Sequence, residues 1–504
     1  MALLFGLAYL LIAFSRIAYP YDLDFLEDSV LMQSARLAEA QPVYAPLNAE
    51  FVPHVYMPLY FWLGGLLVKL AGVSFAPLRL ISLAATLATA VLIYWIARRA
   101  GGLRWVALAC AGLWLGGYRL TDGWYELARV DPLFVALSLG GFMLGVYAGA
   151  STRRLVVSAV VLALAFLTKQ TGVVFALGLS VYLLITVGRR AWLFVGVYAI
   201  LIVVPVVVLN AQSDGWFNYY AFGIASSNPI EIDRIVNYIR FELFGSLAAL
   251  SVMALMVGVL SVRRLGLSVI RERPWLIGVT LAVLISGMGR ASVGGALNNL
   301  MSVYAWLCLS PALLVREWRI IQTTNPLRPM TRAEAAGLRT HEPLRLSSSV
   351  LRLFSPRAEL LAAAILLQFA LGVYNPFRFI PNAELRRSGD RLIARIAAID
   401  GEVFVMMHPY YALLAGKPPS AQIAIAWHAR ERGVLPLPGD LVDRLQSRYY
   451  AAIISDESLF ETDPPLAELL EAYYVRSELL TESDAPPTLT GMVVRPQVVY
   501  VPRR

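Results

Sequence analysis

The chain has 504 residues, of which 58% are hydrophobic and only 15% are charged, and its mean hydropathy is +0.63. Soluble domains of ordinary composition do not reach this hydropathy, so the composition indicates a polytopic membrane protein. The net charge of +9 does not indicate nucleic-acid binding, because most arginines lie in short connections between apolar runs. Both cysteines, Cys110 and Cys308, lie in apolar segments, which excludes a disulfide or cysteine-metal framework.

About eleven apolar runs have the length, or nearly the length, that crosses roughly 30 Å of hydrocarbon. In chain order they cover residues 1–19, 77–97, 103–119, 132–149, 155–168, 171–187, 191–209, 243–261, 275–289, 297–315 and 358–375. The first run has no basic start and no small-residue cleavage pattern. We therefore expect a retained transmembrane helix there rather than a signal peptide.

Basic residues occupy every second connection between these runs, as the positive-inside rule requires of cytoplasmic loops. The last basic connection, residues 316–357, is rich in arginine and is expected to be a cytoplasmic surface loop that touches anionic lipid. The intervening connections then face outward together. They are residues 118–131, 169–171, 210–241 and 290–299, and the tail from Asn375.

A further apolar stretch at residues 58–73 follows an acidic first loop, residues 20–76. If this stretch also crossed the membrane, the first loop would lie on the side opposite to the other outward loops. We therefore predict an interfacial helix on the outer surface, at a depth that suits Tyr60, Phe61 and Trp62. The alternative is an ordinary spanning helix, with one other segment miscounted.

The composition changes after the last apolar run, which divides the chain into a membrane domain, residues 1–375, and a second domain, residues 376–504. In the second domain, residues 403–407, 450–454 and 492–501 have the pattern of strands, and residues 423–432 have the pattern of a helix. This predicts a small extracytoplasmic α/β domain. His408 is interpreted as a residue at the end of a strand rather than as a ligand.

The first outward loop carries Asp22, Asp24, Glu27 and Asp28 within seven residues. Asp24 and Glu27 are three apart and share a face if the segment is helical. We favour this pair as the groups that accept a proton, with Asp28 in reserve. Asp22 is interpreted as a solvated charge at the rim.

Three cations in other outward loops, Arg129, Lys169 and Arg290, are candidates to bind an anionic headgroup, because ionisable residues at membrane depth are costly and tend to be functional. The supporting candidates near them are Asp131, Gln170, Asn298, Asn299, His54 and Tyr56.

Each candidate also has a structural interpretation. Arg129 could pair with Asp131 or Glu126 at a helix end, Lys169 could extend to the interface, and Arg290 could be a loop charge without a ligand. The asparagine pair could cap a helix. His54 and Tyr56 could pack within their loop.

The order of the motifs adds a resemblance. The acidic first loop is followed by VYMPLYFWLGGLLVKLAGVSFAPLRLIS, ARVDPLFVAL, LALAFLTKQTGVVF and GRASVGGALNN. This order resembles the GT-C superfamily of polyprenyl-phosphate-dependent glycosyltransferases, particularly family 39 and the RgtA/B/C/D-like group. The resemblance covers about residues 1–310. Many relatives have an Asp-Glu pair in the first loop, whereas this chain has Asp24 and Glu27 separated by two residues.

The resemblance implies a membrane glycosyltransferase that moves a hexose or pentose from a polyprenyl-phosphate-linked donor to a hydroxyl of an envelope glycan, lipid or protein. A first-loop carboxylate would act as the base, and Arg129, Lys169 and Arg290 would stabilise the charge on the departing phosphate. Attack opposite the phosphate would invert the anomeric centre. Asp24, Glu27 and Asp131 could hold a divalent cation such as Mg²⁺ or Mn²⁺, although their spacing is no metal signature.

Two other classes of function remain open at this point. A transporter or flippase of an amphiphilic lipid-linked substrate would also carry intramembrane charges, but the halves of the chain do not repeat. A scaffold would act through its second domain. The scarcity of lysine relative to arginine fits a GC-rich bacterial genome, so we expect a multi-pass protein of a bacterial inner membrane with its site on the periplasmic face.

Overall fold

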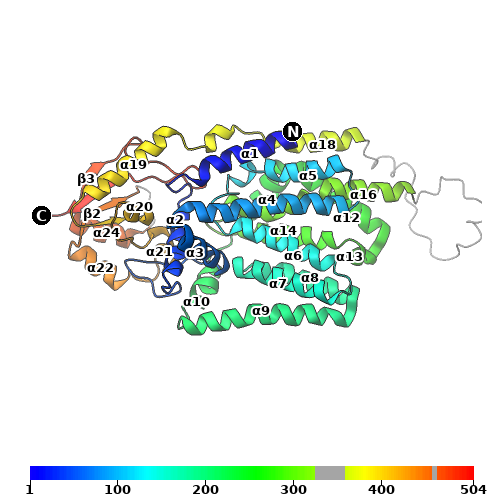
Figure 1. Cartoon of the computed structure of the whole chain (residues 1–504), viewed down its shortest axis with the longest axis horizontal. Helices are drawn as coiled ribbons and strands as arrows, with labels where there is room; N and C mark the ends of the chain where they lie inside the picture. Colours follow the sequence, from blue (N-terminus) through cyan, green and yellow to red (C-terminus); the bar gives the residue numbers. More distant parts are fainter. Residues whose placement is uncertain (324–357, 457–462) are drawn as a thin grey trace, which may run out of the picture.

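The computed structural model describes residues 1–323, 358–456 and 463–504. Its long axis runs from a helical bundle to a smaller α/β region that holds the C-terminus (Figure 1). The basic loop expected at residues 316–357 lies mostly outside the described residues, which include only its first part, in helix α16 (Ser310–Thr323).

Each apolar run that the sequence analysis singles out coincides with a helix. These helices are α1 (Ala2–Ile17), α4 (Phe75–Arg99), α5 (Arg104–Gly116), α6 (Asp131–Val146), α7 (Thr152–Thr168), α8 (Gly172–Val187), α9 (Ala191–Gln212), α12 (Ala248–Leu265), α14 (Pro274–Ala291), α15 (Leu300–Leu307) with α16, and α18 (Ala358–Leu371). Shorter segments join them: α10 (Trp216–Asn218), η3 (Tyr219–Ile224), α11 (Ile232–Asn237), η4 (Tyr238–Ser246), α13 (Val269–Glu272) and η6 (Leu297–Asn299).

Within the described residues, 5 helical stretches are long and apolar enough to cross a membrane, and α18 with the segment after it would bring the number to 6. One of these stretches contains α8 and α9, which contact each other across a turn at Gly188, where φ is 60°. Helices α1, α5 and α6 are apolar but shorter. The chain is thus a multi-pass membrane protein, while the number of eleven crossings stays a prediction.

The acidic loop leads into α2 (Glu27–Ala38), which packs against α3 (Leu59–Ala71) at one end of the bundle (Figure 1). Two glycines of α3 permit this contact, because a Cβ at Gly64 would lie 2.7 Å from Ser34 Oγ and one at Gly65 would lie 2.9 Å from Leu37 Cβ. With 13 residues, α3 is about 20 Å long and shorter than a membrane span. Its interfacial position stays a prediction.

The basic connections gather at the opposite end of the bundle. The Arg190 guanidinium donates to the carbonyl of Ala150 at 3.2 Å, and the Arg319 guanidinium donates to that of Gly101 at 2.9 Å. A cavity of about 230 Å³ at this end is lined by residues of α4, α6, α8, α13, α14 and α16, including Arg271 of α13. The basic connections that the sequence places on one side of the membrane are thus in contact in pairs.

The α/β region contains four strands: β1 (Glu402–Val405), β2 (Tyr450–Ser455), β3 (Tyr474–Leu479) and β4 (Val498–Pro502). Their order is β1-β2-β4-β3, with β1 and β2 parallel and the other pairs antiparallel. The helices of this region are α19 (Ala383–Ala398), α20 (Pro409–Leu414), α21 (Ile423–Ala429), α22 (Gly439–Gln446) and α24 (Pro464–Tyr473).

The strands expected at residues 403–407 and 450–454 are β1 and β2, whereas the strand expected at 492–501 begins only at Val498. The expected helix at 423–432 ends at Ala429, because Glu431 and Arg432 have positive φ values of 51° and 63°. Strand β3 was not expected from the sequence. This edge strand exposes all but its first residue, so it lacks the alternation that marks a half-buried strand.

A segment near the C-terminus lies on the first loop. The amides of Leu489 and Thr490 donate to the carbonyl of Leu23 at 3.1 and 2.9 Å, and Arg16 donates to Thr490 Oγ1 at 2.6 Å. The amide of Gly491 donates to Asp122 at 3.1 Å. The tail therefore contacts both the first and the second outward loop.

The two ends of the bundle predict opposite labelling by a membrane-impermeant maleimide in intact cells. Ala383→Cys, exposed in α19, should react, and Ala150→Cys, exposed at the basic end, should react only after permeabilisation. The wild type serves as the control, because Cys110 and Cys308 are buried. Labelling of Ala150→Cys but not of Ala383→Cys in intact cells would show that the predicted orientation is wrong.

Candidate active site

Glu27, at the start of α2, is held by a buried arginine. The Arg79 Nε and Nη2 donate to its two carboxylate oxygens at 3.0 and 2.7 Å, and the amides of Leu23 and Ala128 donate to the same oxygens at 2.8 and 2.7 Å. Both side chains are fully buried. Since four donors already occupy Glu27, its carboxylate fits a structural role better than that of a base.

The same guanidinium organises the backbone of the first loop. Arg79 donates to the carbonyls of Arg16, Tyr19 and Tyr21 at 2.8, 2.7 and 2.9 Å, and it lies 4.6 Å from the ring centroid of Phe75. Arg79, which stands in the motif APLRLIS, was not among the candidates from the sequence. A lone arginine inside an apolar run was the available signal, because such a charge needs a partner.

Asp24 lies next to Glu27 but has a different environment. Its Oδ2 accepts from Arg129 Nη1 at 3.1 Å and from the amide of Leu26 at 3.3 Å. Burial raises the pKa of Asp24 to about 7, against the lowering effect of Arg129. Unlike the oxygens of Glu27, Asp24 Oδ1 is buried and has no hydrogen-bond partner, so it can accept a proton.

Several buried polar atoms around Asp24 and Arg129 also lack partners. They are Arg129 Nε, Gln33 Nε2 and both ring nitrogens of His54. The His54 ring stacks on Tyr56, with centroids 4.5 Å apart, and the Tyr56 hydroxyl accepts from Arg129 Nη2 at 3.1 Å. Burial, followed by the charge of Arg129, lowers the pKa of His54 well below its ordinary value. Buried polar groups are usually paired, so this group suggests a polar ligand.

The C-terminal segment approaches the free oxygen of Asp24. A Cβ on Gly491 would lie 3.0 Å from Asp24 Oδ1 and 3.0 Å from the Trp124 ring, and Gly491 has a φ of 70°. Trp124 in turn lies against Arg129, whose guanidinium carbon is 4.6 Å from the ring centroid. Glycine is required here both by the backbone conformation and by the close contact.

The second cation candidate, Lys169, forms a separate cluster. Its Nζ donates to Asp131 Oδ1 at 2.8 Å, and Asn298 Nδ2 donates to Asp131 Oδ2 at 3.0 Å. Asn299 accepts from Lys169 at 3.4 Å, and Gln170 donates to the carbonyls of Val55 and Ala221. The contacts of Lys169, Gln170 and Asn298 therefore join five outward loops. Neither asparagine side chain caps the helix, contrary to the capping alternative.

The other candidate ion pairs differ from those considered from the sequence. Arg129 pairs with Asp24, and Glu126 pairs with Arg16 at 2.7 Å. Arg290 donates to Glu242 of η4 at distances of 2.6, 2.9 and 3.0 Å. Nε and Nη2 of Arg290 both donate to the Glu242 carboxylate. Arg290 is therefore less available to a phosphate than Arg129 or Lys169.

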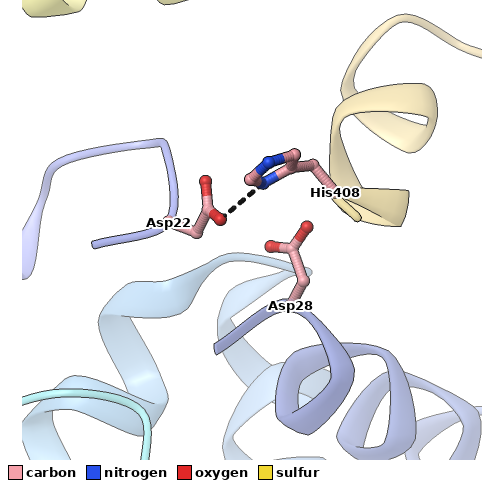
Figure 2. Close-up of side chains that lie close together, drawn as sticks. All are labelled: Asp22, Asp28 and His408. Carbon is pink, nitrogen blue, oxygen red and sulfur yellow. Dashed lines mark hydrogen bonds and ion pairs between the residues drawn. The ribbon is translucent and has the colours of Figure 1, made fainter. Parts of the chain in front are cut away.

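The interpretation of Asp22 as a solvated rim charge is wrong. Asp22 is 2% exposed, and its oxygens bond the hydroxyl of Tyr411 and Nδ1 of His408, the latter at 2.7 Å (Figure 2). His408 follows β1, as expected, but it also bonds Asp456 at 3.3 Å through Nε2. The contacts of Asp22 with Tyr411 and His408 could not be read from the sequence, because these partners are more than 380 residues away from it.

The three residues proposed for a metal do not form a common site. Asp24, Glu27 and Asp131 are each paired with a different cation, respectively Arg129, Arg79 and Lys169. Among the described residues, the group of carboxylates and histidine close enough to share an ion is Asp22, Asp28 and His408.

Comparisons with known proteins give the fold. A sequence model of the family of dolichyl-phosphate-mannose-protein mannosyltransferases matches residues 53–209. The structure of ArnT from Cupriavidus metallidurans bound to undecaprenyl phosphate superposes with a TM-score of 0.59 at 15% identity, over 99% of this chain and 97% of that chain. Its apo structure gives 0.58 at 15%, over the same shares. The Archaeoglobus fulgidus oligosaccharyltransferase in its apo form gives 0.50 at 12%, over 94% and 72%. No curated protein sequence matches.

The chain has the fold of the GT-C glycosyltransferases. The resemblance predicted from the order of motifs is thus confirmed. The matched family segment contains Arg79, Arg129 and Lys169, whereas Asp24 precedes it. The GT-C fold therefore brings the first loop to cations that follow much later in the sequence.

The buried ion pair of Glu27 predicts that loss of its carboxylate destabilises the protein more than loss of an exposed carboxylate does. Glu27→Gln should lower the melting temperature strongly, because breaking a buried ion pair costs about 3 to 5 kcal/mol. Thermal unfolding of the purified protein in detergent measures this effect. Glu50→Gln is the matched control, since Glu50 is 60% exposed in its pair with Arg444, and exposed pairs contribute about 0 to 1 kcal/mol. Equal melting temperatures for both variants would contradict the structural role of Glu27.

Proposed function

We propose that this chain is a membrane glycosyltransferase that moves a sugar from a polyprenyl-phosphate donor to a hydroxyl of an envelope glycan, lipid or protein. The observation that carries the proposal is the Asp24–Arg129 pair, in which a buried carboxylate keeps one oxygen free within a GT-C fold. The ArnT neighbour was crystallised bound to undecaprenyl phosphate, which supports a lipid-phosphate carrier as the donor.

Asp24 is the base in this proposal. Its carboxylate accepts the proton of the acceptor hydroxyl as the oxygen attacks the anomeric carbon, and the bond from that carbon to the phosphate oxygen breaks. A positioned base of this kind contributes about 10² to 10⁴ in rate. The leaving group is the polyprenyl phosphate. Attack from the face opposite the phosphate inverts the anomeric centre.

Arg129 and Lys169 are the cations that we assign to the donor phosphate. Arg129 retains an unused Nε–H, and Lys169 is 15% exposed beside Asp131. Cations at these positions would stabilise the negative charge that grows on the departing phosphate. We assign Arg290 instead to holding α14 against η4 through Glu242.

We assign acceptor recognition to the outward loop of residues 210–241 and to the α/β region together. The Tyr219 hydroxyl donates to the carbonyl of Ala429 at 2.7 Å, and Asn228 accepts from Arg432 at 2.7 Å. Trp216 lies beside Tyr219 and Tyr220, with centroids 5.3 and 5.9 Å apart. Aromatic rings in this loop can stack on sugars. The proposed location is the periplasmic face of a bacterial inner membrane.

The function is tested by comparing envelope glycans and glycolipids by mass spectrometry in a deletion strain and in complemented strains. Wild type should restore a sugar that the deletion removes, and Asp24→Asn should lower it at least a hundredfold, because Asn cannot accept the proton. Asp400→Asn, an exposed aspartate, is the matched control.

Full restoration by Asp24→Asn would contradict the assignment of the base. The transporter alternative predicts movement of a labelled lipid-linked sugar across proteoliposomes without any covalent product. That result, together with intact glycans in the Asp24→Asn strain, would show that the protein acts as a flippase rather than as a transferase.

The donor assignment predicts that Lys169→Gln weakens the binding of undecaprenyl phosphate about tenfold to a hundredfold, since a hydrogen bond to a charged group contributes about 1.5 to 3 kcal/mol. Titration in nanodiscs, followed by native mass spectrometry, measures the affinity. Lys69→Gln removes an exposed lysine at the end of α3 and is the control. Equal affinities for both variants would remove Lys169 from the phosphate site.

A further inference from the structure

A second cluster of buried ionisable groups lies apart from the Asp24–Arg129 pair. It joins Asp22 of the first loop, Asp28 of α2, and His408 between β1 and α20, and the three offer ligand atoms within 4.8 Å of one another. All three side chains are buried. Asp456, after β2, is 2% exposed and bonds the far nitrogen of His408 at 3.3 Å.

The charges in this cluster do not balance. Three carboxylates, those of Asp22, Asp28 and Asp456, surround one imidazole. Arg79, which holds the first loop, is already committed to Glu27 and to three backbone carbonyls. Buried charges in proteins are paired or coordinate metals, so the excess of negative charge calls for a cation.

One atom of the cluster is unpartnered. Asp28 Oδ2 accepts a 3.4 Å hydrogen bond from the amide of Tyr410, but Asp28 Oδ1 is buried without a partner. In Figure 2 the Asp28 carboxylate points toward the space between Asp22 and His408. An unsatisfied carboxylate oxygen that faces two further ligand atoms is an independent indication of a bound ion.

The surroundings of His408 match those of a metal ligand. Metal-binding histidines almost always donate their other ring N–H to a carboxylate or a carbonyl, which fixes the ring and its tautomer. Here Asp456 is positioned to accept from Nε2, which leaves Nδ1 facing Asp22. The hydroxyl of Tyr411 similarly holds the other oxygen of Asp22. Each ligand thus has its own support.

We propose that Asp22, Asp28 and His408 Nδ1 bind a divalent transition-metal ion of the Zn²⁺ or Mn²⁺ class, with Asp456 orienting the imidazole. One imidazole with two carboxylates suits these ions better than Mg²⁺ or Ca²⁺, which prefer oxygen ligands alone. At ligand distances of about 2.1 Å, tetrahedral ligand atoms lie roughly 3.4 Å apart. The three ligand atoms, which lie within 4.8 Å of one another, are therefore close to the spacing that such an ion needs.

The ion would fasten the α/β region to the membrane part of the protein. Asp22 and Asp28 belong to the first loop and α2, whereas His408 belongs to the α/β region. The site therefore has a structural role beside the proposed active site and is independent of which reaction Asp24 performs.

The test uses the full chain, purified in detergent, stripped with EDTA and equilibrated separately with Zn²⁺, Mn²⁺ and Mg²⁺. Bound metal is measured by mass spectrometry of the elements, and the melting temperature is recorded with and without metal. Wild type should retain about one Zn²⁺ or Mn²⁺ per chain and melt several degrees higher with it. Asp28→Asn and His408→Gln should lose both effects.

The control variants carry the same types of substitution, His→Gln and Asp→Asn, at residues outside the cluster. His428→Gln alters a histidine that contacts Asn228, and Asp400→Asn alters an exposed carboxylate. Both should retain the metal. The proposal is overturned if wild type binds no more metal than Asp28→Asn and Asp28→Asn melts at the same or a higher temperature. Asparagine would then only relieve repulsion between carboxylates. Binding of Mg²⁺ alone would overturn it as well.

Discussion

The first outward loop depends on one buried ion pair, between Arg79 of α4 and Glu27 of α2. The guanidinium uses all five of its N–H groups, two on the carboxylate and three on backbone carbonyls of the loop. The carboxylate in turn accepts the amide of Ala128, in the second loop. A buried charge is tolerated only when its partners are complete. This pair therefore fixes the path of the chain on both sides of Asp24.

Neighbouring carboxylates in this loop have different hydrogen-bond environments, which suit them to different roles. Glu27 is saturated by donors and supports the backbone, whereas Asp24 shares one cation and keeps a free oxygen. Asp28 and Asp22 face His408 instead. Four acidic residues in seven positions thus separate into a support, a candidate base and a cluster that joins two regions of the protein.

The sequence was sufficient for features that depend on local patterning. Apolar runs located the helices, because hydropathy acts over short stretches of chain. The fold was expected from the resemblance of the ordered motifs to a known superfamily. The sequence also offered Arg129 and Lys169 as candidates, since charges at membrane depth are costly, and Asp24 as one of four carboxylates in the first loop. It could not tell Asp24 from Glu27. That distinction depends on Arg79, which lies more than fifty residues away and whose partners are mostly backbone atoms.

The contacts between the α/β region and the first loop could not be predicted from the sequence for a related reason. His408 looks like any residue at the end of a strand until the fold brings Asp22 against it. Asp22 and His408 are too far apart in the sequence for any periodic pattern to connect them. The edge strand β3 was not predicted because its residues do not alternate between buried and exposed, and not because its partners lie far away in the sequence. Long-range polar contacts and exposed strands are therefore the two classes of feature that local patterns did not predict here.

The contact of the tail with the first loop has a consequence for biosynthesis. Arg16 and Thr490, which hydrogen-bond to each other, are 474 residues apart in the chain. At about 5 to 20 residues per second, a ribosome needs roughly 25 to 100 seconds between the first of these residues and the last. The helices enter the membrane during this time, while Asp24 still lacks the segment around Gly491 that lies over it. A nascent or prematurely terminated chain therefore lacks part of the candidate site, so that the completion of translation itself sets the moment at which this contact forms.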